Sequence, residues 1–157
     1  MARIAFLFLL ALALTSCGSS RKVMDSTNDT ASQVVEQARS FAGTPYQYGG
    51  TTNRGMDCSG LIHTAFAKEN IILPRVSRDM ARYGKPVKLK QVEKGDLLFF
   101  GTGKNRRRIN HVGLVTDVTT DDIYFIHATT SRGVLESSLS ERYWNRAFVE
   151  AKTVINP

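Results

Sequence analysis

The apolar residues of this chain change their spacing along its length, and each change predicts a different kind of structure. Residues 4–14 form an unbroken apolar run. From Ala31 to Ala42 the apolar residues recur at helical spacing, and Gly43 follows as a helix stop. A second helical pattern begins after Asp57 and continues to about Asn70. The front half of the chain is therefore predicted to hold two principal helices.

A shorter helix is predicted between these two helices and the back half. Pro74 disfavours helix at Leu73, which ends the preceding pattern. Ser77 is then a suitable cap for a short helix that continues to about Tyr83, where Gly84 ends it.

From Leu97 onward the pattern is typical of strands. Leu97–Phe100 is continuously apolar, which predicts a strand buried on both faces. The later strand patterns, bounded by turn residues, are His111–Val118, Ile123–Ala128, a short edge strand at Gly133–Ser137, and Ala147–Ile155, which is expected to close the sheet. Helices followed by an antiparallel meander predict an α+β fold.

Residues 1–16 are typical of an export signal. Arg3 supplies a positive charge ahead of the apolar run, which is too short to span a membrane. The run ends in LTSCG at residues 14–18, which resembles a bacterial lipobox, so Cys17 is expected to carry lipid and to anchor the mature chain to a membrane. An ordinary secretory signal with an incidental cysteine is the alternative. Residues 17–30, rich in Ser, Asp, Asn and Thr, are predicted to form a flexible tether.

The remainder, residues 31–157, has the length of one domain, and no repeat divides it. The formal charge of the chain is +7, and loss of Arg3 with the leader leaves +6. This excess favours an acidic partner, such as an anionic wall polymer or an anionic lipid. Nucleic acid is not expected, because the chain is predicted to be exported and its aromatic residues do not alternate with basic ones.

Cys58 is a candidate nucleophile because of its position at the start of a predicted helix. Asp57 is a good N-cap residue, and the positive end of the helix dipole would stabilise a thiolate at Cys58. If Cys17 carries lipid, Cys58 has no cysteine partner for a disulfide. The alternative is a small buried apolar side chain, since free cysteine is among the most buried residue types.

Two of the three histidines are candidates for the base that such a cysteine needs. His63 lies on the nucleophile helix but about 140° around it from Cys58, so we expect a surface residue. If the hairpin pairs residues whose numbers sum to 240, His127 faces Gly113 and shares a face with His111, and the glycine leaves space for the ring. One imidazole could then orient the other. Metal binding is the alternative, but it needs a third ligand, and no metal is expected.

Six motifs then occur in an order that resembles the NlpC family of cell-wall cysteine peptidases, over about residues 31–156. They are PYQYGG at 45–50, DCSGL at 57–61, LPR at 73–75, GDLLFF at 95–100, HVG at 111–113 and FIHA at 125–128. The resemblance implies a papain-like α+β fold and, within the family, is closest to single-domain murein endopeptidase lipoproteins.

The same resemblance implies a role for each motif residue. Cys58 would be the nucleophile, His111 the base and His127 the residue that orients the base, while Tyr46 would help to form the oxyanion hole. Three further residues would line the substrate cleft: Asp57, Ser59 and Arg75.

The implied reaction is hydrolysis of amide bonds in peptidoglycan stem peptides or cross-links, with no cofactor. We expect a monomer that is held by its lipid on the periplasmic side of the outer membrane. A non-catalytic wall-binding lipoprotein and a papain-like amidase or acyltransferase are the alternatives. The basic segment Arg106–Arg108 is expected to flank the cleft, because it closely precedes His111.

Overall fold

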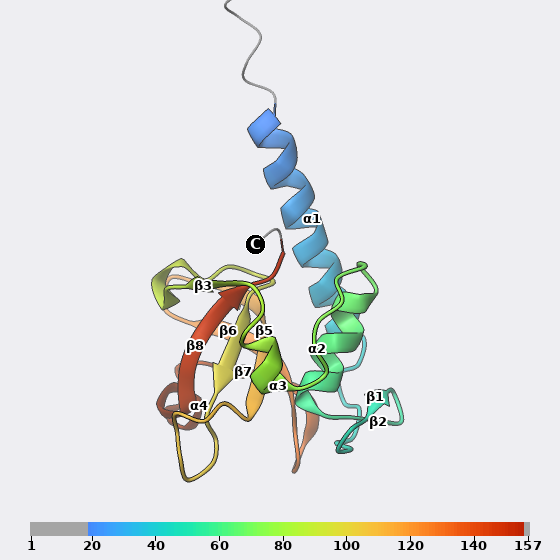
Figure 1. Cartoon of the computed structure of the whole chain (residues 1–157), viewed down its shortest axis with the longest axis vertical. Helices are drawn as coiled ribbons and strands as arrows, with labels where there is room; N and C mark the ends of the chain where they lie inside the picture. Colours follow the sequence, from blue (N-terminus) through green and yellow to red (C-terminus); the bar gives the residue numbers. More distant parts are fainter. Residues whose placement is uncertain (1–18, 156–157) are drawn as a thin grey trace, which may run out of the picture.

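Two helices lie against one face of a six-stranded antiparallel sheet in the computed structural model, which describes the backbone of residues 19–155 and the side chains of residues 29–155 (Figure 1). The helices are α1 (Ser19–Arg39) and α2 (Cys58–Ala67). The predictions for the leader and for Cys17 concern residues outside the described part.

The sheet has the order β3-β8-β4-β5-β6-β7, with every neighbouring pair antiparallel. Its strands are β3 (Lys85–Val87), β4 (Leu97–Phe100), β5 (His111–Val118), β6 (Ile123–Thr129), β7 (Gly133–Ser138) and β8 (Phe148–Thr153). The remaining elements are the hairpin of β1 (Thr51–Thr52) and β2 (Gly55–Met56), the short helices α3 (Ser77–Met80) and α4 (Arg142–Ala147), and the 3-10 turn η1 (Leu89–Gln91).

Most of the predicted strands are confirmed, but the edge of the sheet was predicted incorrectly. The strand β7 lies at one edge, as expected for Gly133–Ser137. The strand β8 does not close the sheet, because β3 pairs with its outer side. The pattern did not reveal β3, since it is short and contains Pro86, a residue that sheets tolerate at an edge.

Two helix starts also differ from the prediction. The helix α1 begins at Ser19, within the segment predicted as a tether, because a helix docked along its later residues extends easily into a polar stretch. The short helix α3 has Val76 at its N-cap, and Ser77 is its first residue and is buried, so the predicted cap at Ser77 is wrong. No helix within residues 19–155 is both long enough and apolar enough to cross a membrane.

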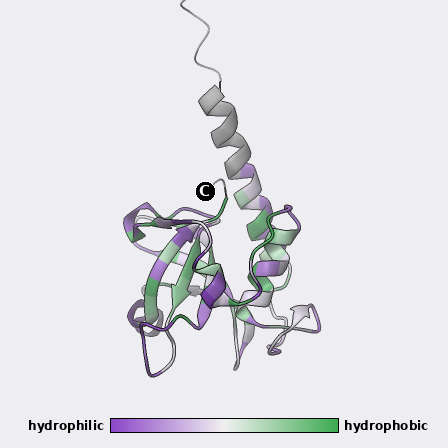
Figure 2. Cartoon of the chain, in the orientation of Figure 1, coloured by the Kyte–Doolittle hydropathy of each residue, from purple (hydrophilic) through white to green (hydrophobic). Residues whose placement is uncertain are grey.

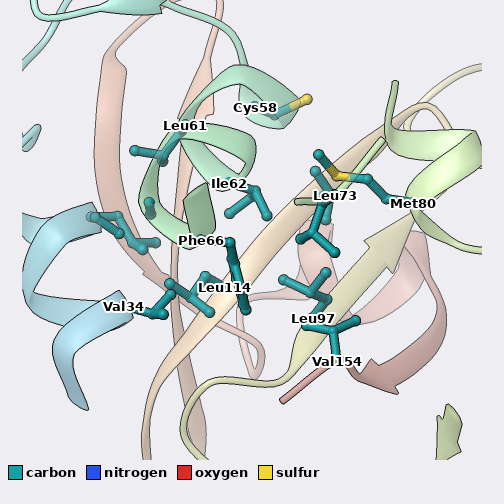
Figure 3. Packing of buried hydrophobic residues seen from close by; sticks show 14 of the residues in the cluster. Val34, Cys58, Leu61, Ile62, Phe66, Leu73, Met80, Leu97, Leu114 and Val154 are labelled. Atoms are coloured by element: carbon teal, nitrogen blue, oxygen red, sulfur yellow. The ribbon is translucent and has the colours of Figure 1, made fainter. Parts of the chain in front are cut away.

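The core lies on both faces of the sheet, because β4 is buried on both sides as its apolar run predicts. Leu97 and Phe99 pack under α1 and α2, where Phe66 fills the interior (Figure 3). Leu98 and Phe100 face the opposite side and pack under α4. Figure 2 shows the resulting distribution, with apolar strands at the centre and polar loops around them.

The register of the β5–β6 hairpin determines which face of the sheet carries His127, near the end of β6. Leu114 pairs with Ile126 and Val115 pairs with Phe125, so the register sums to 240, the value assumed for the two histidines, and it shifts beyond Val115. The space beside Gly113 is not filled by His127, however. A Cβ atom at Gly113 would lie 2.5 Å from Cδ2 of Phe125, so it is the Phe125 ring that requires glycine there.

Replacing Gly113 by alanine is therefore expected to destabilise the fold. The Phe125 ring is fully buried and must shift, at a cost of about 1–3 kcal/mol in the free energy of unfolding. Gly103→Ala is the matched control, because the nearest atom to its new methyl group is Nδ2 of Asn110 at 3.7 Å. Urea denaturation of both variants measures the difference, and equal midpoints would contradict the packing argument.

Candidate active site

The N-terminus of α2 places Cys58 at the mouth of a cleft. Asp57 is the N-cap, as predicted, and its Oδ1 accepts the N–H of Gly60 at 2.7 Å. Cys58 is the first helical residue, and its sulfur points away from the core side chains beneath the helix (Figure 3). The helix thus fixes the thiol by its own geometry.

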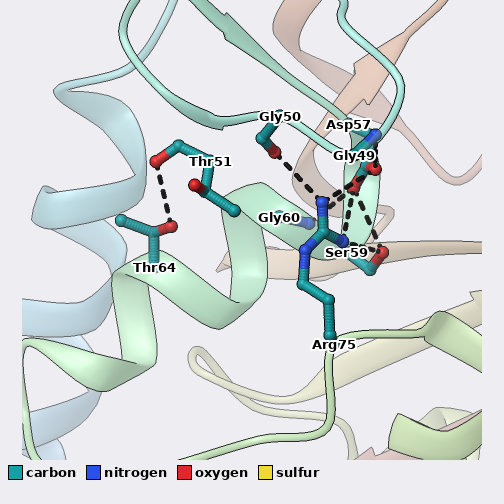
Figure 4. A network of polar contacts seen from close by, with 8 residues as sticks. All are labelled: Gly49, Gly50, Thr51, Asp57, Ser59, Gly60, Thr64 and Arg75. Atoms are coloured by element: carbon teal, nitrogen blue, oxygen red, sulfur yellow. Dashed lines mark hydrogen bonds and ion pairs between the residues drawn. The ribbon is translucent and has the colours of Figure 1, made fainter.

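A second set of contacts holds Asp57 in place from outside the helix. Arg75 donates from Nη1 to Oδ1 and from Nη2 to Oδ2 of Asp57, both at 2.9 Å, in a bidentate pair (Figure 4). It also donates to Oγ of Ser59 at 2.8 Å and to the carbonyl of Gly50 at 3.2 Å, while the N–H of Gly49 donates to Oδ2 of Asp57 at 2.7 Å. One guanidinium therefore joins the PYQYGG loop, the start of α2 and the chain before α3.

The charge of Asp57 is stabilised by these donors. Burial raises the pKa of Asp57, but the hydrogen bonds from Arg75 and from the N–H groups of Gly60 and Gly49 outweigh burial and hold the pKa below its ordinary value. The carboxylate thus stays ionised at neutral pH, with its oxygens already engaged. Asp57 and Ser59 are both buried, so in this cleft it is Arg75, partly exposed, that reaches solvent.

His111 and His127 lie side by side on one face of the sheet, as predicted. Nε2 of His111 lies 2.9 Å from Nδ1 of His127, and Nε2 of His127 lies 3.0 Å from Oγ of Ser137. If Nδ1 of His111 is to accept a proton, its Nε2 must carry one and donate it to His127, which then donates to Ser137. The chain of bonds thus leaves Nδ1 of His111 as the nitrogen available to a thiol.

Aromatic rings surround this histidine pair. Trp144 of α4 stacks on His111, with centroids 5.2 Å apart, and meets His127 edge-on at 4.5 Å. Phe125 contacts His127 at 4.8 Å. Burial lowers the pKa of His111 to about 4, and burial together with the neighbouring His111 and Arg132 lowers that of His127 to about 2. Both imidazoles are therefore neutral at neutral pH.

The thiol of Cys58 is also uncharged in this resting state. Burial raises the pKa of Cys58, and it outweighs the hydrogen bond from the N–H of Val112. The expected stabilisation of a thiolate by the helix dipole is therefore outweighed in the free site. A neutral imidazole beside a neutral thiol can accept its proton when substrate excludes water, so the site suits base-assisted nucleophilic attack.

Two cavities meet at Cys58 and Tyr46. The first, of about 810 Å³, includes Asp57, Ser59 and Arg75 in its lining, and Lys104, Asn105 and Arg108 extend it along the loop before β5. The second, of about 450 Å³, includes His111 and Trp144. Tyr46 is held beside Cys58 by a bridge to Met56, and burial raises the pKa of its hydroxyl, which stays protonated as a donor.

Not every predicted or basic residue joins the cleft. His63 makes no hydrogen bond to a catalytic group. Its Nδ1 lies 2.8 Å from the carbonyl oxygen of Leu73. Arg108 lines the first cavity as expected, whereas Arg106 and Arg107 do not. Among the side chains of residues 29–155, no group of three His, Cys, Asp or Glu is arranged to hold a metal ion.

Sequence reasoning missed Ser137 and Trp144. Ser137 sits opposite Phe125 in the pairing of β6 and β7, so a register for that hairpin would have placed it near His127. Trp144 is the only tryptophan of the chain, and its helix α4 has only six residues, too few to show a helical period.

The motif residues thus converge on one cleft, and comparison with known proteins identifies the arrangement. The sequence profile of the NlpC/P60 family matches residues 43–153, well over half of the chain. The chain belongs to the NlpC/P60 family.

Curated relatives of this NlpC/P60 chain carry peptidase names. A probable endopeptidase of Haemophilus influenzae is 42% identical over 122 residues, which cover 77% of this chain and 73% of that protein. The probable endopeptidase NlpC of Escherichia coli is 35% identical over 159 residues, covering 97% of this chain and 99% of that protein. A protein of Escherichia coli named murein DD-endopeptidase MepS and murein LD-carboxypeptidase is 34% identical over 129 residues, 82% of this chain and 65% of that one.

Solved structures agree on the fold. An NlpC/P60 family protein from Bacillus cereus superposes with a TM-score of 0.72 at 27% identity, covering 80% of this chain and 40% of that one. A Staphylococcus aureus protein described as similar to a lipoprotein of the NLP/P60 family gives a TM-score of 0.70 at 31% identity, covering 82% and 42%. The predicted papain-like α+β fold is confirmed.

The burial of the histidine pair predicts a loss of stability in acid. Both folded-state pKa values lie below the unfolded value near 6.5, so the unfolded chain binds more protons as the pH falls through 6.5. The stability contributed by the neutral pair is complete above pH 6.5 and is lost progressively as the pH falls from 6.5 toward 4, by about 3 kcal/mol.

The variant His127→Gln isolates this effect, because an amide can accept from His111 and donate to Ser137 without titrating. Urea denaturation from pH 7 to pH 4 should show a flatter decline for the variant than for the parent. The carboxylates titrate equally in both proteins and cancel in the comparison. Parallel pH profiles would contradict the assignment of a neutral, buried His127.

Proposed function

We propose that this NlpC/P60 protein is a peptidoglycan endopeptidase that hydrolyses amide bonds of stem peptides or cross-links with a cysteine nucleophile. The observation that carries the proposal is a thiol at a helix N-terminus sharing a cavity with a buried, paired imidazole. Relatives with endopeptidase names, including a murein endopeptidase, support both the reaction and the substrate class.

Cys58 and His111 perform the bond-making steps. Nδ1 of His111 takes the thiol proton as the sulfur attacks the amide carbonyl, which forms the tetrahedral intermediate. The resulting imidazolium keeps its Nε2–H bond to His127 and gives its other proton to the leaving amine. Water then attacks the acyl-enzyme with His111 again as the base, which releases the acid product and restores the thiol.

His127 and Ser137 orient the base. Their hydrogen bonds fix the ring plane and the tautomer of His111, in the way that the third member of a catalytic triad does. A neutral imidazole in this place has no full negative charge to stabilise the imidazolium. His127 therefore aids catalysis by holding the His111 ring in position. Trp144 and Phe125 pack against the histidine rings and restrict their rotation further.

The oxyanion is bound from the two sides of the nucleophile. The backbone N–H of Cys58 is one of the unpaired donors at the start of α2, and the hydroxyl of Tyr46, which lines both cavities, is the second. Arg75, with Asp57 and Ser59, lines the larger cavity and holds the part of the substrate on that side. Because the Asp57 side chain is buried and that of Arg75 is one-third exposed, Arg75 is the group of this pair that contacts the substrate directly.

Residues outside the described part fit the same function. Lipid on Cys17 would hold the enzyme to the outer membrane on its periplasmic side, where it meets peptidoglycan. The protein acts there as a monomer, since all proposed catalytic groups lie within one chain.

Replacing Cys58 by alanine is expected to abolish hydrolysis of purified peptidoglycan, by at least about a thousandfold, because the nucleophile is lost. His111→Gln should do the same. His63→Gln is the matched control, since its ring bonds only the carbonyl of Leu73, and it should retain activity.

Mass spectrometry of the released fragments, with circular dichroism to check folding, gives the result. Glycan chains released together with intact stem peptides would identify an amidase. Products that carry an acyl group transferred from another molecule would identify an acyltransferase. Release of muropeptides by Cys58→Ala at the parent rate would contradict Cys58 as the nucleophile, and absence of cleavage by the folded parent would favour a wall-binding role.

The variant Cys17→Ser tests the anchor. Without the thiol there is no site for lipid, so the protein should move from the membrane fraction to the soluble fraction. Its activity on soluble muropeptides should not change, because Cys17 precedes the catalytic domain. Metabolic labelling with a fatty-acid analogue provides the direct readout, and unchanged membrane partitioning would refute lipidation.

A further inference from the structure

The basic loop and α4 form a second charged hollow beyond the cleft. Arg106 of the loop lines it with three residues of α4, namely Arg142, Tyr143 and Arg146, around a volume of about 440 Å³. The arginines before β5 are therefore divided between two cavities: Arg106 lines this hollow, and Arg108 lines the large catalytic cavity. The sequence presents Arg106–Arg108 as one basic segment, but the fold places its two end residues at different cavities.

The three guanidinium groups are unpaired. Within residues 29–155, none of them makes a side-chain hydrogen bond or an ion pair, whereas Arg39, Arg75 and Arg82 each pair with a carboxylate. The nearest acid in sequence, Glu141, accepts the N–H of Ser138. Three cations thus line one hollow, and no carboxylate within residues 29–155 forms an ion pair with any of them.

This arrangement opposes helix stability. Arg142 and Arg146 are four residues apart on one face of α4, where like charges repel. Arg142 also lies in the first turn, at the positive end of the helix dipole, whereas Arg146 lies in the last turn, where a positive charge is favourable. Such charges are stabilised when an anion binds between them, and a guanidinium binds a carboxylate with two parallel hydrogen bonds.

The hollow adjoins the catalytic cleft. The half-exposed Tyr143 lines both this hollow and the cavity that contains Cys58 and His111. Its neighbour Trp144 packs on both histidines, so α4 carries the hollow at a fixed position relative to the catalytic pair. A ligand in the hollow is therefore within reach of a chain bound at Cys58.

We propose that the hollow of Arg106, Arg142, Tyr143 and Arg146 is a remote subsite that binds a free carboxylate of the peptide being cleaved. The inference rests on the proposed function, which supplies a peptide substrate with carboxylates on its stems. The subsite selects anionic stem peptides over amidated ones, and it does so through binding, since its three arginines line neither of the cavities that contain Cys58.

The double variant Arg142→Gln/Arg146→Gln tests the subsite in the full chain, purified in detergent. With a soluble muropeptide that has free carboxylates, KM should rise about tenfold at low salt and kcat should stay within about twofold, because two charge-assisted contacts are lost. With the same muropeptide amidated at its carboxylates, parent and variant should have equal KM. An equal KM on the free acid, or an equal rise on both forms, would overturn the proposal.

Matched controls separate the hollow from general charge effects. Arg107→Gln removes a charge from the same loop but from outside the three cavities, so it should leave KM unchanged, while Arg106→Gln should raise it. Lys85→Gln/Lys88→Gln removes two exposed charges at the β3 side and should also leave KM unchanged. Equal effects of Arg106→Gln and Arg107→Gln would contradict the assignment.

Binding measured on the inactive Cys58→Ala protein keeps this test independent of the proposed reaction. Isothermal calorimetry should show tighter binding of the free acid than of the amidated peptide, and the added double variant should abolish the difference. If the parent cleaves neither peptide but this preference persists, the reaction fails and the subsite stands. Loss of binding to phosphatidylglycerol vesicles in the double variant, without any preference among peptides, would assign the hollow to a membrane and overturn the proposal.

Discussion

The site depends on the bidentate pair between Asp57 and Arg75. Before the chain folds, the PYQYGG loop, the start of α2 and the segment before α3 are held together only by the peptide chain. The Asp57 carboxylate accepts hydrogen bonds from the loop and from the helix, and Arg75 spans all three segments. Without Arg75 the buried carboxylate would keep its hydrogen bonds from Gly49 and Gly60 but lose its counter-charge, at a cost on the order of 3 kcal/mol. The salt bridge therefore anchors the start of α2, and with it the nucleophile, although it makes and breaks no bond of the substrate.

The opposite wall of the cleft is held by packing. Trp144, Phe125 and Phe100 enclose the histidine pair, and the Phe125 ring occupies the space beside Gly113. The Asp57–Arg75 pair positions the thiol, and the aromatic rings position the imidazole. Burial of Cys58 and of His111 keeps the thiol and the imidazole neutral in the free site.

The sequence predicts the parts of the structure that depend on local signals. Asp57 as a helix cap and the doubly buried strand at Leu97–Phe100 follow from the residues themselves, whereas the placement of His111 beside His127 follows only once the hairpin register is assumed. What could not be predicted depends on contacts between distant segments. Examples are the pairing of β3 with β8, the bond from Ser137 to His127 and the approach of Trp144 from a six-residue helix. The charge state of Cys58 belongs to the same class, because burial outweighs the local helix dipole only once the sheet is in place.

The meeting of two cavities at Cys58 has a consequence for the architecture of the polymer that the enzyme can attack. One cavity extends toward Arg75 and Arg108 and the other toward Trp144, so a chain bound at the thiol has room on both sides of the scissile bond. Such a chain needs no terminus within the site. A cross-linked polymer with few free chain ends is therefore still a substrate. Cleavage inside such a network enlarges its pores, whereas removal of terminal residues would not.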